Sequence, residues 1–388
     1  MPQPKSREKE AEESNQFTGR AFDRPSNRNS RPRTKTRPDH ASAITGMVIG
    51  VDRGRYQVLV DPDTEVQAMK ARELGRDRIV VGDQVDLVGD TSGNKDTLAR
   101  IVRIAERTSV LRRTADDNDP FERVVVANAD QLMIVVACAD PEPRIGMIDR
   151  AVVAAYEAGM SACLVLTKAD LAPPDELLRL YEPAGVTAIV TKPAVVAGSD
   201  SVISERHDDG SLALDPTALA EVNAALLGKT TVFLGHSGVG KSTLVNALVP
   251  GAGRATGAVN VTTGRGRQTS TSVVALPLPG GLGWVIDTPG IRSLGIAHVE
   301  TAHVIAAFPE LEAVADELCP RGCSHLATAP DCALDEWMVE NTAVEPMREL
   351  RVSSLRRLLS ARAEADTDLR RHASLMQRRA ASSDRKEG

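Results

Sequence analysis

The stretch GHSGVGKST, which we call the phosphate loop, has the composition and spacing of a loop that binds phosphate groups. It follows the apolar run TVFL and precedes a helical pattern, as the motif G-x-x-x-x-G-K-[ST] requires. Its glycines let backbone N–H groups curl around a β-phosphate, while Lys241 can reach the β- and γ-oxygens and assist catalysis, and Ser242 can offer a hydroxyl to Mg²⁺. The predicted nucleotide-binding residues of this loop are Gly235, His236, Ser237, Gly238, Val239, Gly240, Lys241, Ser242 and Thr243.

A second motif, WVIDTPG, ends an apolar run at Asp287 and continues to Gly290. Asp287 at a strand tip can hold Mg²⁺ directly or through water, and the N–H of Gly290 can face a γ-phosphate. Between the two motifs lies NVTTGRGRQTSTS, a polar segment where a flexible switch loop is expected. A hydroxyl from this segment should complete the Mg²⁺ shell, and the candidates are Ser270 or Thr271, with Thr269 less favoured.

A third motif, LVLTKADL, places Thr167, Lys168 and Asp170 at the end of an apolar run, and we call Thr167 to Asp170 the guanine loop. The Asp170 carboxylate can accept from the N1 and N2 donors of guanine together, a pair that adenine lacks, and the Lys168 stem can pack along the base. Thr167 replaces the commoner Asn, which removes one amide contact. Base-reading loops of this type normally follow DTPG, yet residues 291–388 contain none. We therefore predict a permuted chain order, which folds tolerate because domain termini often lie close together.

Three of the five cysteines crowd together with a histidine in CPRGCSHLATAPDC. Cys319, Cys323, His325 and Cys332 form a Cys₃His set, which suits a closed tetrahedral zinc site. In a reducing compartment this crowding favours metal over disulfides, although reduced core thiols are the alternative. Such a site leaves no position open for water, so its zinc would be structural rather than catalytic.

Four segments of different pattern must position these residues. Residues 1–43 are polar, with a basic later half, and should be disordered. Residues 44–107 show short apolar segments punctuated by Gly and Asp, the rhythm of a small antiparallel β-barrel such as an OB-fold. Residues 108–298 begin with a connector, RRTADDNDPFE, and then alternate strands and helices, which predicts an α/β domain with a mostly parallel, doubly wound sheet. Residues 299–388 hold the cysteine cluster and one or two arginine-rich helices, which are solvated or contact RNA.

Overall composition places the chain among soluble globular proteins. Hydrophobic residues make up 42% of the 388 residues and charged residues 26%. No apolar stretch approaches the ~20 residues needed to span a bilayer, and the amino terminus lacks a secretory signal, so we expect a cytoplasmic protein without a membrane partner. The net charge of -6 does not by itself indicate a nucleic-acid partner. We expect a monomer.

The motif order TKAD, GHSGVGKS, GRGRQTST, DTPG and a Cys/His cluster, with a β-barrel in front, resembles the circularly permuted GTPases. More closely, it resembles the family of small ribosomal subunit biogenesis GTPases over about residues 44 to 360. The resemblance implies an OB-fold, a circularly permuted P-loop GTPase domain and a zinc-binding domain. It also implies that GTP, bound with Mg²⁺, is hydrolysed to GDP and phosphate under stimulation by the small (30S) ribosomal subunit and its rRNA, late in the maturation of that subunit.

Two positions depart from the family pattern. Gln268 stands where the family usually has a histidine in Gly-Arg-His-Thr-Thr-Thr. Its amide could orient the attacking water, a role that Ile291 cannot fill; the alternative is that Gln268 is a plain residue of the switch loop. In the cysteine cluster the first gap is one residue shorter than usual and the last about one longer, which implies a local loop shift. The alternatives to an enzyme are a GTP-gated RNA- or ribosome-binding module with only incidental turnover, and an ATP-dependent kinase or transporter subunit that leaves TKAD and DTPG unexplained.

Overall fold

The computed structural model describes residues 40–94, 96–114, 122–194, 213–250, 273–289, 294–339 and 345–384. Almost all of the predicted N-terminal tail lies outside these ranges. The predicted switch residues also lie outside them: Gln268, Thr269, Ser270, Thr271, Gly290 and Ile291.

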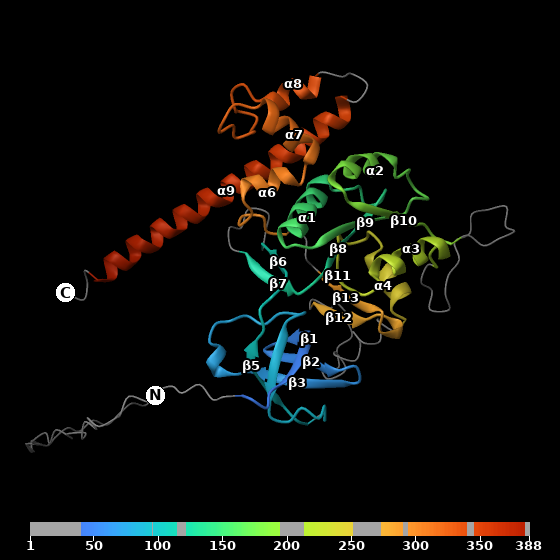
Figure 1. Ribbon diagram of the computed structural model, residues 1–388, viewed down its shortest axis with the longest axis vertical. Coiled ribbons are helices and arrows are strands. Elements are labelled where there is room, and N and C mark those ends of the chain that lie inside the picture. The colour runs from blue at the N-terminus through green and yellow to red at the C-terminus, as the bar shows by residue number, and fades with distance from the viewer. Residues whose placement is uncertain are drawn as a thin grey trace, which may run out of the picture. The chain divides into compact units, whose positions relative to one another are not determined.

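The N-terminal part of the described chain forms a closed five-stranded barrel (Figure 1). Each strand pairs with the next in the order β1-β2-β3-β5-β4, and β4 pairs back onto β1, which closes the barrel. The β3–β5 pair is parallel and the others are antiparallel. Alternate side chains such as Val48, Val58 and Leu87 fill the interior, so the predicted β-barrel is confirmed. The strands are β1 (Ile44–Asp52), β2 (Arg55–Asp61), β3 (Thr64–Lys70), β4 (Gln84–Val88) and β5 (Ala99–Ile104), with the 3-10 turn η1 (Arg72–Leu74) after β3.

A short hairpin follows the barrel. Strands β6 (Val110–Arg113) and β7 (Arg123–Ala127) pair antiparallel as a separate two-stranded sheet of the described chain. The sequence-based connector begins at Arg112, but the structure continues β6 through Arg113. The sequence pattern of β7 also does not indicate that this strand pairs with β6, which precedes it, rather than with the strand that follows it. The strand is too short for its pattern to indicate a partner.

The α/β domain is built on a mostly parallel sheet in the order β10-β9-β8-β11-β13-β12, as predicted. Its edge strand β12 runs antiparallel to β13 and meets the barrel strand β1 at one paired position, Gly50 with Val274. One continuous sheet therefore joins the barrel to the α/β domain within the described residues. The strands are β8 (Gln131–Ala137), β9 (Ser161–Thr167), β10 (Thr187–Val190), β11 (Lys229–Gly235), β12 (Val274–Pro277) and β13 (Gly283–Asp287), with the 3-10 turn η4 (Pro279–Gly281) between the last two.

Helices cover both faces of this sheet (Figure 1). Successive side chains of β8 alternate between two buried clusters: Leu132 and Ile134 pack with α1 (Ile145–Glu157), whereas Met133 packs with the helices of the opposite face. Helix α2 (Asp175–Tyr181) and the turn η2 (Glu182–Ala184) contribute to the first cluster, and α3 (Pro216–Leu226) and α4 (Lys241–Leu248) to the second. The doubly wound arrangement is thus confirmed.

The C-terminal part is helical and shares the first buried cluster with α1. The predicted arginine-rich segment is one helix of 40 residues, α9 (Glu345–Asp384), which buries Val352 and Leu355. Its Arg357 forms an ion pair with Asp149 of α1 at 3.1 Å, so the first turns of α9 are anchored on the α/β domain. Among the described residues, none of the helices has the length and apolar character to cross a membrane. The other helices are α6 (Thr301–Ala306), α7 (Pro309–Leu318) and α8 (Ala333–Val339).

Candidate nucleotide site and metal centre

The phosphate loop lies at the carboxyl end of β11, between that strand and α4, which begins at Lys241. A Cβ atom at Gly235 would lie 2.8 Å from the carbonyl oxygen of Val135 on the neighbouring strand, so the loop can leave the sheet here only with glycine. Gly240 has a φ of 92°, a left-handed conformation that starts the helix. The loop thus presents the N-terminus of α4 at the edge where doubly wound sheets bind ligands.

Asp287 lies next to the phosphate loop. Asp287 is the last residue of β13, which lies beside β11, and its carboxylate forms an ion pair with the Lys241 ammonium. The next residue, Thr288, is buried and donates its hydroxyl to the carbonyl oxygen of Phe233 at 2.6 Å. This bond ties the start of the DTPG motif to the strand that carries the phosphate loop. Thr288 was not singled out from the sequence, because its partner lies 55 residues away.

The guanine loop lies beside the phosphate loop despite the reversed order in the chain. Thr167 ends β9, and its hydroxyl donates to the carbonyl oxygen of Val239 in the phosphate loop at 2.5 Å. Lys168 has a φ of 55° and donates its ammonium to the carbonyl oxygen of Asp140. The Asp170 side chain is exposed, so its carboxylate is accessible to a ligand. The structure therefore brings the guanine loop and the phosphate loop together.

Sequence reasoning missed two further contributors to the guanine loop. Thr191, directly after β10, is buried and donates its N–H to the carbonyl oxygen of Leu166 at 2.7 Å. Its own carbonyl oxygen accepts from the N–H of Ala169 at 3.4 Å, so both bonds hold the guanine loop against the end of β10. The available signal was the apolar run TAIV before Thr191, which has the form of a buried strand ending in a polar residue. Asp140 carries no such signal, because only its backbone is used.

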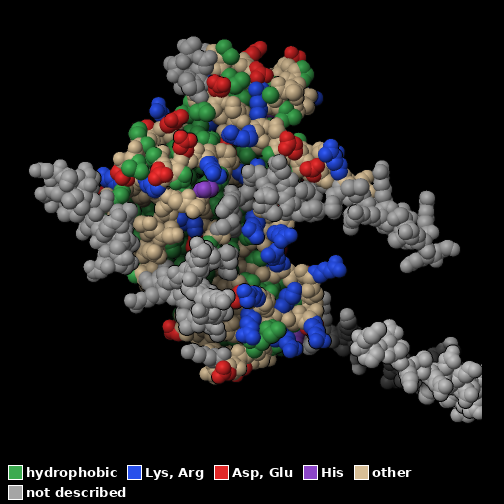
Figure 2. All heavy atoms as spheres, turned by 180° about the vertical axis from the view of Figure 1, so that it is seen from behind, with side chains coloured by type: hydrophobic (Ala, Val, Ile, Leu, Met, Phe, Trp, Pro, Cys, Tyr) green, Lys and Arg blue, Asp and Glu red, His purple; other side chains and the backbone are tan. Residues whose placement is uncertain are grey.

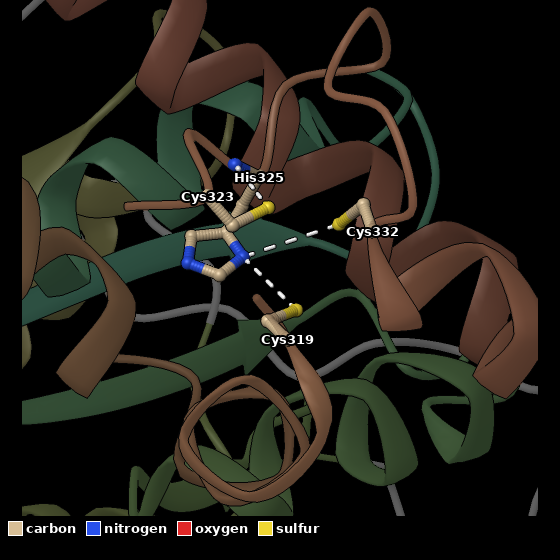
Figure 3. Close-up of side chains that lie close together, drawn as sticks. All are labelled: Cys319, Cys323, His325 and Cys332. Atoms are coloured by element: carbon tan, nitrogen blue, oxygen red, sulfur yellow. Dashed lines mark hydrogen bonds between the residues drawn. The ribbon is translucent and has the colours of Figure 1, made fainter. Parts of the chain in front are cut away.

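The four residues of the Cys₃His set converge at one point of the C-terminal part (Figure 3). Their candidate ligand atoms all lie within 4.8 Å of one another. The Nδ1 atom of His325 lies 3.6 Å from the Cys319 sulfur and 4.0 Å from the Cys332 sulfur. Cys319 directly follows α7, and Cys332 directly precedes α8, so the two helices position the first and last members. Arg356 of α9 donates to the carbonyl oxygen of His325 at 3.2 Å and braces the loop between them.

This donor set fits a metal ion. Tetrahedral zinc with Zn–S distances of about 2.3 Å would place its sulfur ligands roughly 3.8 Å apart, close to the spacing of the cluster. Burial raises the pKa of the Cys332 thiol to about 11, and the neighbouring Cys323 and Cys319 add to this effect. Burial and the nearby Arg356 guanidinium lower the pKa of His325, which favours the neutral imidazole that binds metals. The Cys₃His group could therefore hold a metal ion, whose charge would favour the thiolate form.

Fold and site together define a circularly permuted GTPase, in which the guanine loop precedes the phosphate loop along the chain and lies beside it in space. Residues 104–297 match the profile of the RsgA GTPase family. The chain belongs to this family, whose members are GTPases, hydrolases that act on GTP.

Several relatives share most of their length with this chain. The Small ribosomal subunit biogenesis GTPase RsgA of Gemmatimonas aurantiaca is 33% identical over 319 residues, which cover 79% of this chain and 94% of that protein. The protein of the same name from Pseudomonas aeruginosa is 34% identical over 294 residues, which cover 74% and 77%.

Two solved structures share the fold. YjeQ from Thermotoga maritima has a TM-score of 0.54 at 24% identity and covers 82% of this chain and 99% of its own. YloQ, described as a circularly permuted GTPase, has a TM-score of 0.53 at 23% identity, with coverage of 84% and 98%.

Proposed function

We propose that this protein hydrolyses GTP to GDP and phosphate during late maturation of the small ribosomal subunit, and that the 30S subunit stimulates its turnover. One observation carries the nucleotide assignment: the hydrogen bond from Thr167 to Val239 makes the guanine loop and the phosphate loop adjacent, so a single nucleotide can contact both. The ribosomal role rests on the names of the relatives, which are small ribosomal subunit biogenesis GTPases.

At one end of the nucleotide, Asp170 accepts from N1 and N2 of guanine, and Lys168 packs its stem along the base. The backbone N–H groups from Gly235 to Thr243 surround the β-phosphate at the other end. Lys241 pairs with Asp287, and when nucleotide binds its ammonium group moves from that carboxylate to the β- and γ-phosphate oxygens. This exchange frees the Asp287 carboxylate for the cation that accompanies GTP.

Ser242 stands exposed in the first turn of α4 and Asp287 at the tip of β13, so these two residues are our proposed magnesium ligands. The bound Mg²⁺ would neutralise charge that develops on the phosphate oxygens. From the sequence we further propose that Ser270 or Thr271 supplies the switch hydroxyl, that the Gly290 N–H faces the γ-phosphate, and that Gln268 orients the attacking water. These four residues lie outside the described part of the chain.

We propose that the Cys₃His cluster holds one structural zinc ion. Four protein ligands would close its coordination shell, so the ion would stabilise the packing of α7, α8 and α9 rather than take part in hydrolysis. The bracing of His325 by Arg356 links this ion to the long helix.

We propose that the outer face of the barrel contacts rRNA. Figure 2 shows Lys and Arg side chains gathered over this part of the molecule. Arg55, Met69 and Arg100 lie in one row across β2, β3 and β5, each exposed on the outer face. Two guanidinium groups flanking an apolar side chain suit contact with a phosphate backbone better than recognition of bases.

We propose a monomer that acts in the cytoplasm on the small subunit.

Multiple-turnover GTP hydrolysis tests the proposal, measured with the full chain alone, with purified small subunits and with large subunits. Small subunits should raise the rate, large subunits should not, and Lys241→Ala should abolish turnover in every condition. GTP-dependent binding to small subunits without any stimulation would instead indicate a binding module. Preference for ATP over GTP in competition would overturn the nucleotide assignment.

A further inference from the structure

The segment Leu294–Val299 begins seven positions after Asp287 and ends just before α6. Leu294, Ile296 and Val299 are buried in the cluster that also holds α1 and α9. The N–H of Gly295 donates to the carbonyl oxygen of Arg112 on β6 at 3.1 Å. The segment Leu294–Val299 is therefore packed into the protein interior.

A single carboxylate holds the middle of this segment. Glu122, directly before β7, accepts the N–H of Ala297 at 2.8 Å through Oε1 and contacts Nδ1 of His298 at 2.5 Å through Oε2. Its side chain is only 8% exposed. Burial by itself would raise the pKa of Glu122, but the bonds to His298 and Ala297 and the charge of Arg112 bring that pKa below its ordinary value. The carboxylate is thus held ionised and bonded on both oxygens.

Gly295 shows how closely the two parts fit. A Cβ atom at this position would lie 2.7 Å from Cγ of Glu122, within the range that real Cβ contacts avoid. The backbone of the segment therefore rests directly on the Glu122 side chain. Only glycine leaves room for that approach.

The far end of the segment is held by the C-terminal helix. The carbonyl oxygen of Val299 accepts from Nε of Arg362 on α9 at 2.5 Å. The segment Leu294–Val299 thus contacts both the hairpin β6–β7 and α9, and it shares a buried cluster with Ile286, the residue of β13 before Asp287. The backbone of this segment is hydrogen-bonded to both neighbours, and its apolar side chains are buried. A displacement at one end of the segment would therefore move the other end as well.

We propose that Glu122 is a positioning residue that couples the nucleotide state at Asp287 to α9 by fixing the segment Leu294–Val299. The proposal rests on the GTPase function proposed above. It adds that the segment Leu294–Val299 transmits the difference between bound GTP and bound GDP to α9. Glu122 touches neither nucleotide nor metal. It acts on turnover by keeping the segment Leu294–Val299 in one position while the phosphate loop and the guanine loop bind GTP.

The test compares Glu122→Ala and Glu122→Gln with the wild-type chain. A matched control is Glu157→Gln, because Glu157 forms a similar pair with His303 at 2.7 Å, between α1 and α6 and outside the segment. In small-subunit-stimulated hydrolysis, Glu122→Ala should lower kcat by about tenfold and change KM for GTP less than about twofold. Glu122→Gln can still accept from Ala297 and should retain part of the rate, while Glu157→Gln should match the wild type.

Hydrogen exchange of α9 distinguishes coupling from simple destabilisation. In the wild type, the amides around Arg362 should exchange at different rates with a GTP analogue and with GDP. Glu122→Ala should abolish that difference while the nucleotide-dependent protection of the phosphate loop remains. A merely structural role would speed exchange equally in both nucleotide states and leave the difference in place, which would overturn the proposal.

A double-mutant cycle checks the contact itself. Gly295→Ala should impair turnover in the wild type, because the added Cβ meets Glu122, but should add little to Glu122→Ala, where the obstacle is gone. Additive effects would contradict the proposed contact. If the wild type fails to hydrolyse GTP with small subunits, the proposed function fails, whereas the exchange measurement still decides whether Glu122 couples bound nucleotide to α9.

Discussion

The hydroxyl of Thr167 lies 2.5 Å from the carbonyl oxygen of Val239, and this hydrogen bond joins two loops that stand 72 residues apart in the chain. The same hydroxyl lies 3.3 Å from the carbonyl oxygen of Val136. On sequence alone, Thr167 was expected to provide less than the Asn found more often at its position. Its structural role is to brace the phosphate loop, a task that a short hydroxyl side chain performs because β8, β9 and β11 lie side by side.

Replacing Thr167 with Val should therefore weaken nucleotide binding. The change preserves shape but removes the donor to a buried carbonyl, which costs about 1–3 kcal/mol. We expect GTP affinity, measured by calorimetry, to fall by about tenfold. Thr167→Ser keeps the hydroxyl and should bind almost as the wild type does; equal affinity for the Val and Ser variants would show that the bond does not matter for the site.

Asp170 should determine the choice of base. Asp170→Asn replaces an acceptor with an amide that donates, so it loses the paired contact with N1 and N2 of guanine and gains a match for the C2 carbonyl of xanthine. GTP affinity should fall by about 100-fold and xanthosine triphosphate affinity should rise. Competition between the two nucleotides measures this. The control is Asp175→Asn, an exposed aspartate at the start of α2, which should change neither affinity.

The Cys₃His cluster should lose its metal when one thiolate is removed. Freshly purified wild-type protein should contain close to one zinc equivalent, and Cys332→Ser less than about half, with a lower Tm because metal binding contributes to folding. Cys163→Ser changes a buried thiol of β9 outside the cluster and should keep its zinc. A full equivalent of zinc in the Cys332 variant, determined by elemental analysis, would exclude Cys332 as a ligand.

Packing of α9 on the α/β domain should make a large contribution to stability. Leu355 is fully buried in the cluster shared with α1, so Leu355→Ala should lower the free energy of unfolding by about 2–5 kcal/mol. Leu350 lies on the same helix but is 36% exposed, and Leu350→Ala should cost less than about 1 kcal/mol. Urea denaturation of both variants provides the comparison, and similar losses would contradict the packing that the structure describes.

Much of the fold could be predicted from local patterns. The barrel, the mostly parallel sheet and the convergence of the Cys₃His set all follow from apolar periodicity and motif spacing, because each pattern extends over one continuous stretch. The permuted order also followed from sequence, since the motif TKAD had no counterpart after DTPG. The roles of Gln268 and the switch hydroxyls remain predictions from the sequence.

Tertiary structure alone decided which distant groups meet. The pairing of β6 with β7, the joint between β1 and β12, the support of the guanine loop by Thr191 and the hold of Glu122 on Ala297 involve residues that are unremarkable in their own surroundings. Motif residues are recognisable because their chemistry requires fixed types at fixed spacing. A supporting residue needs only one suitable atom near its partner, and that proximity arises when the strands and helices have packed.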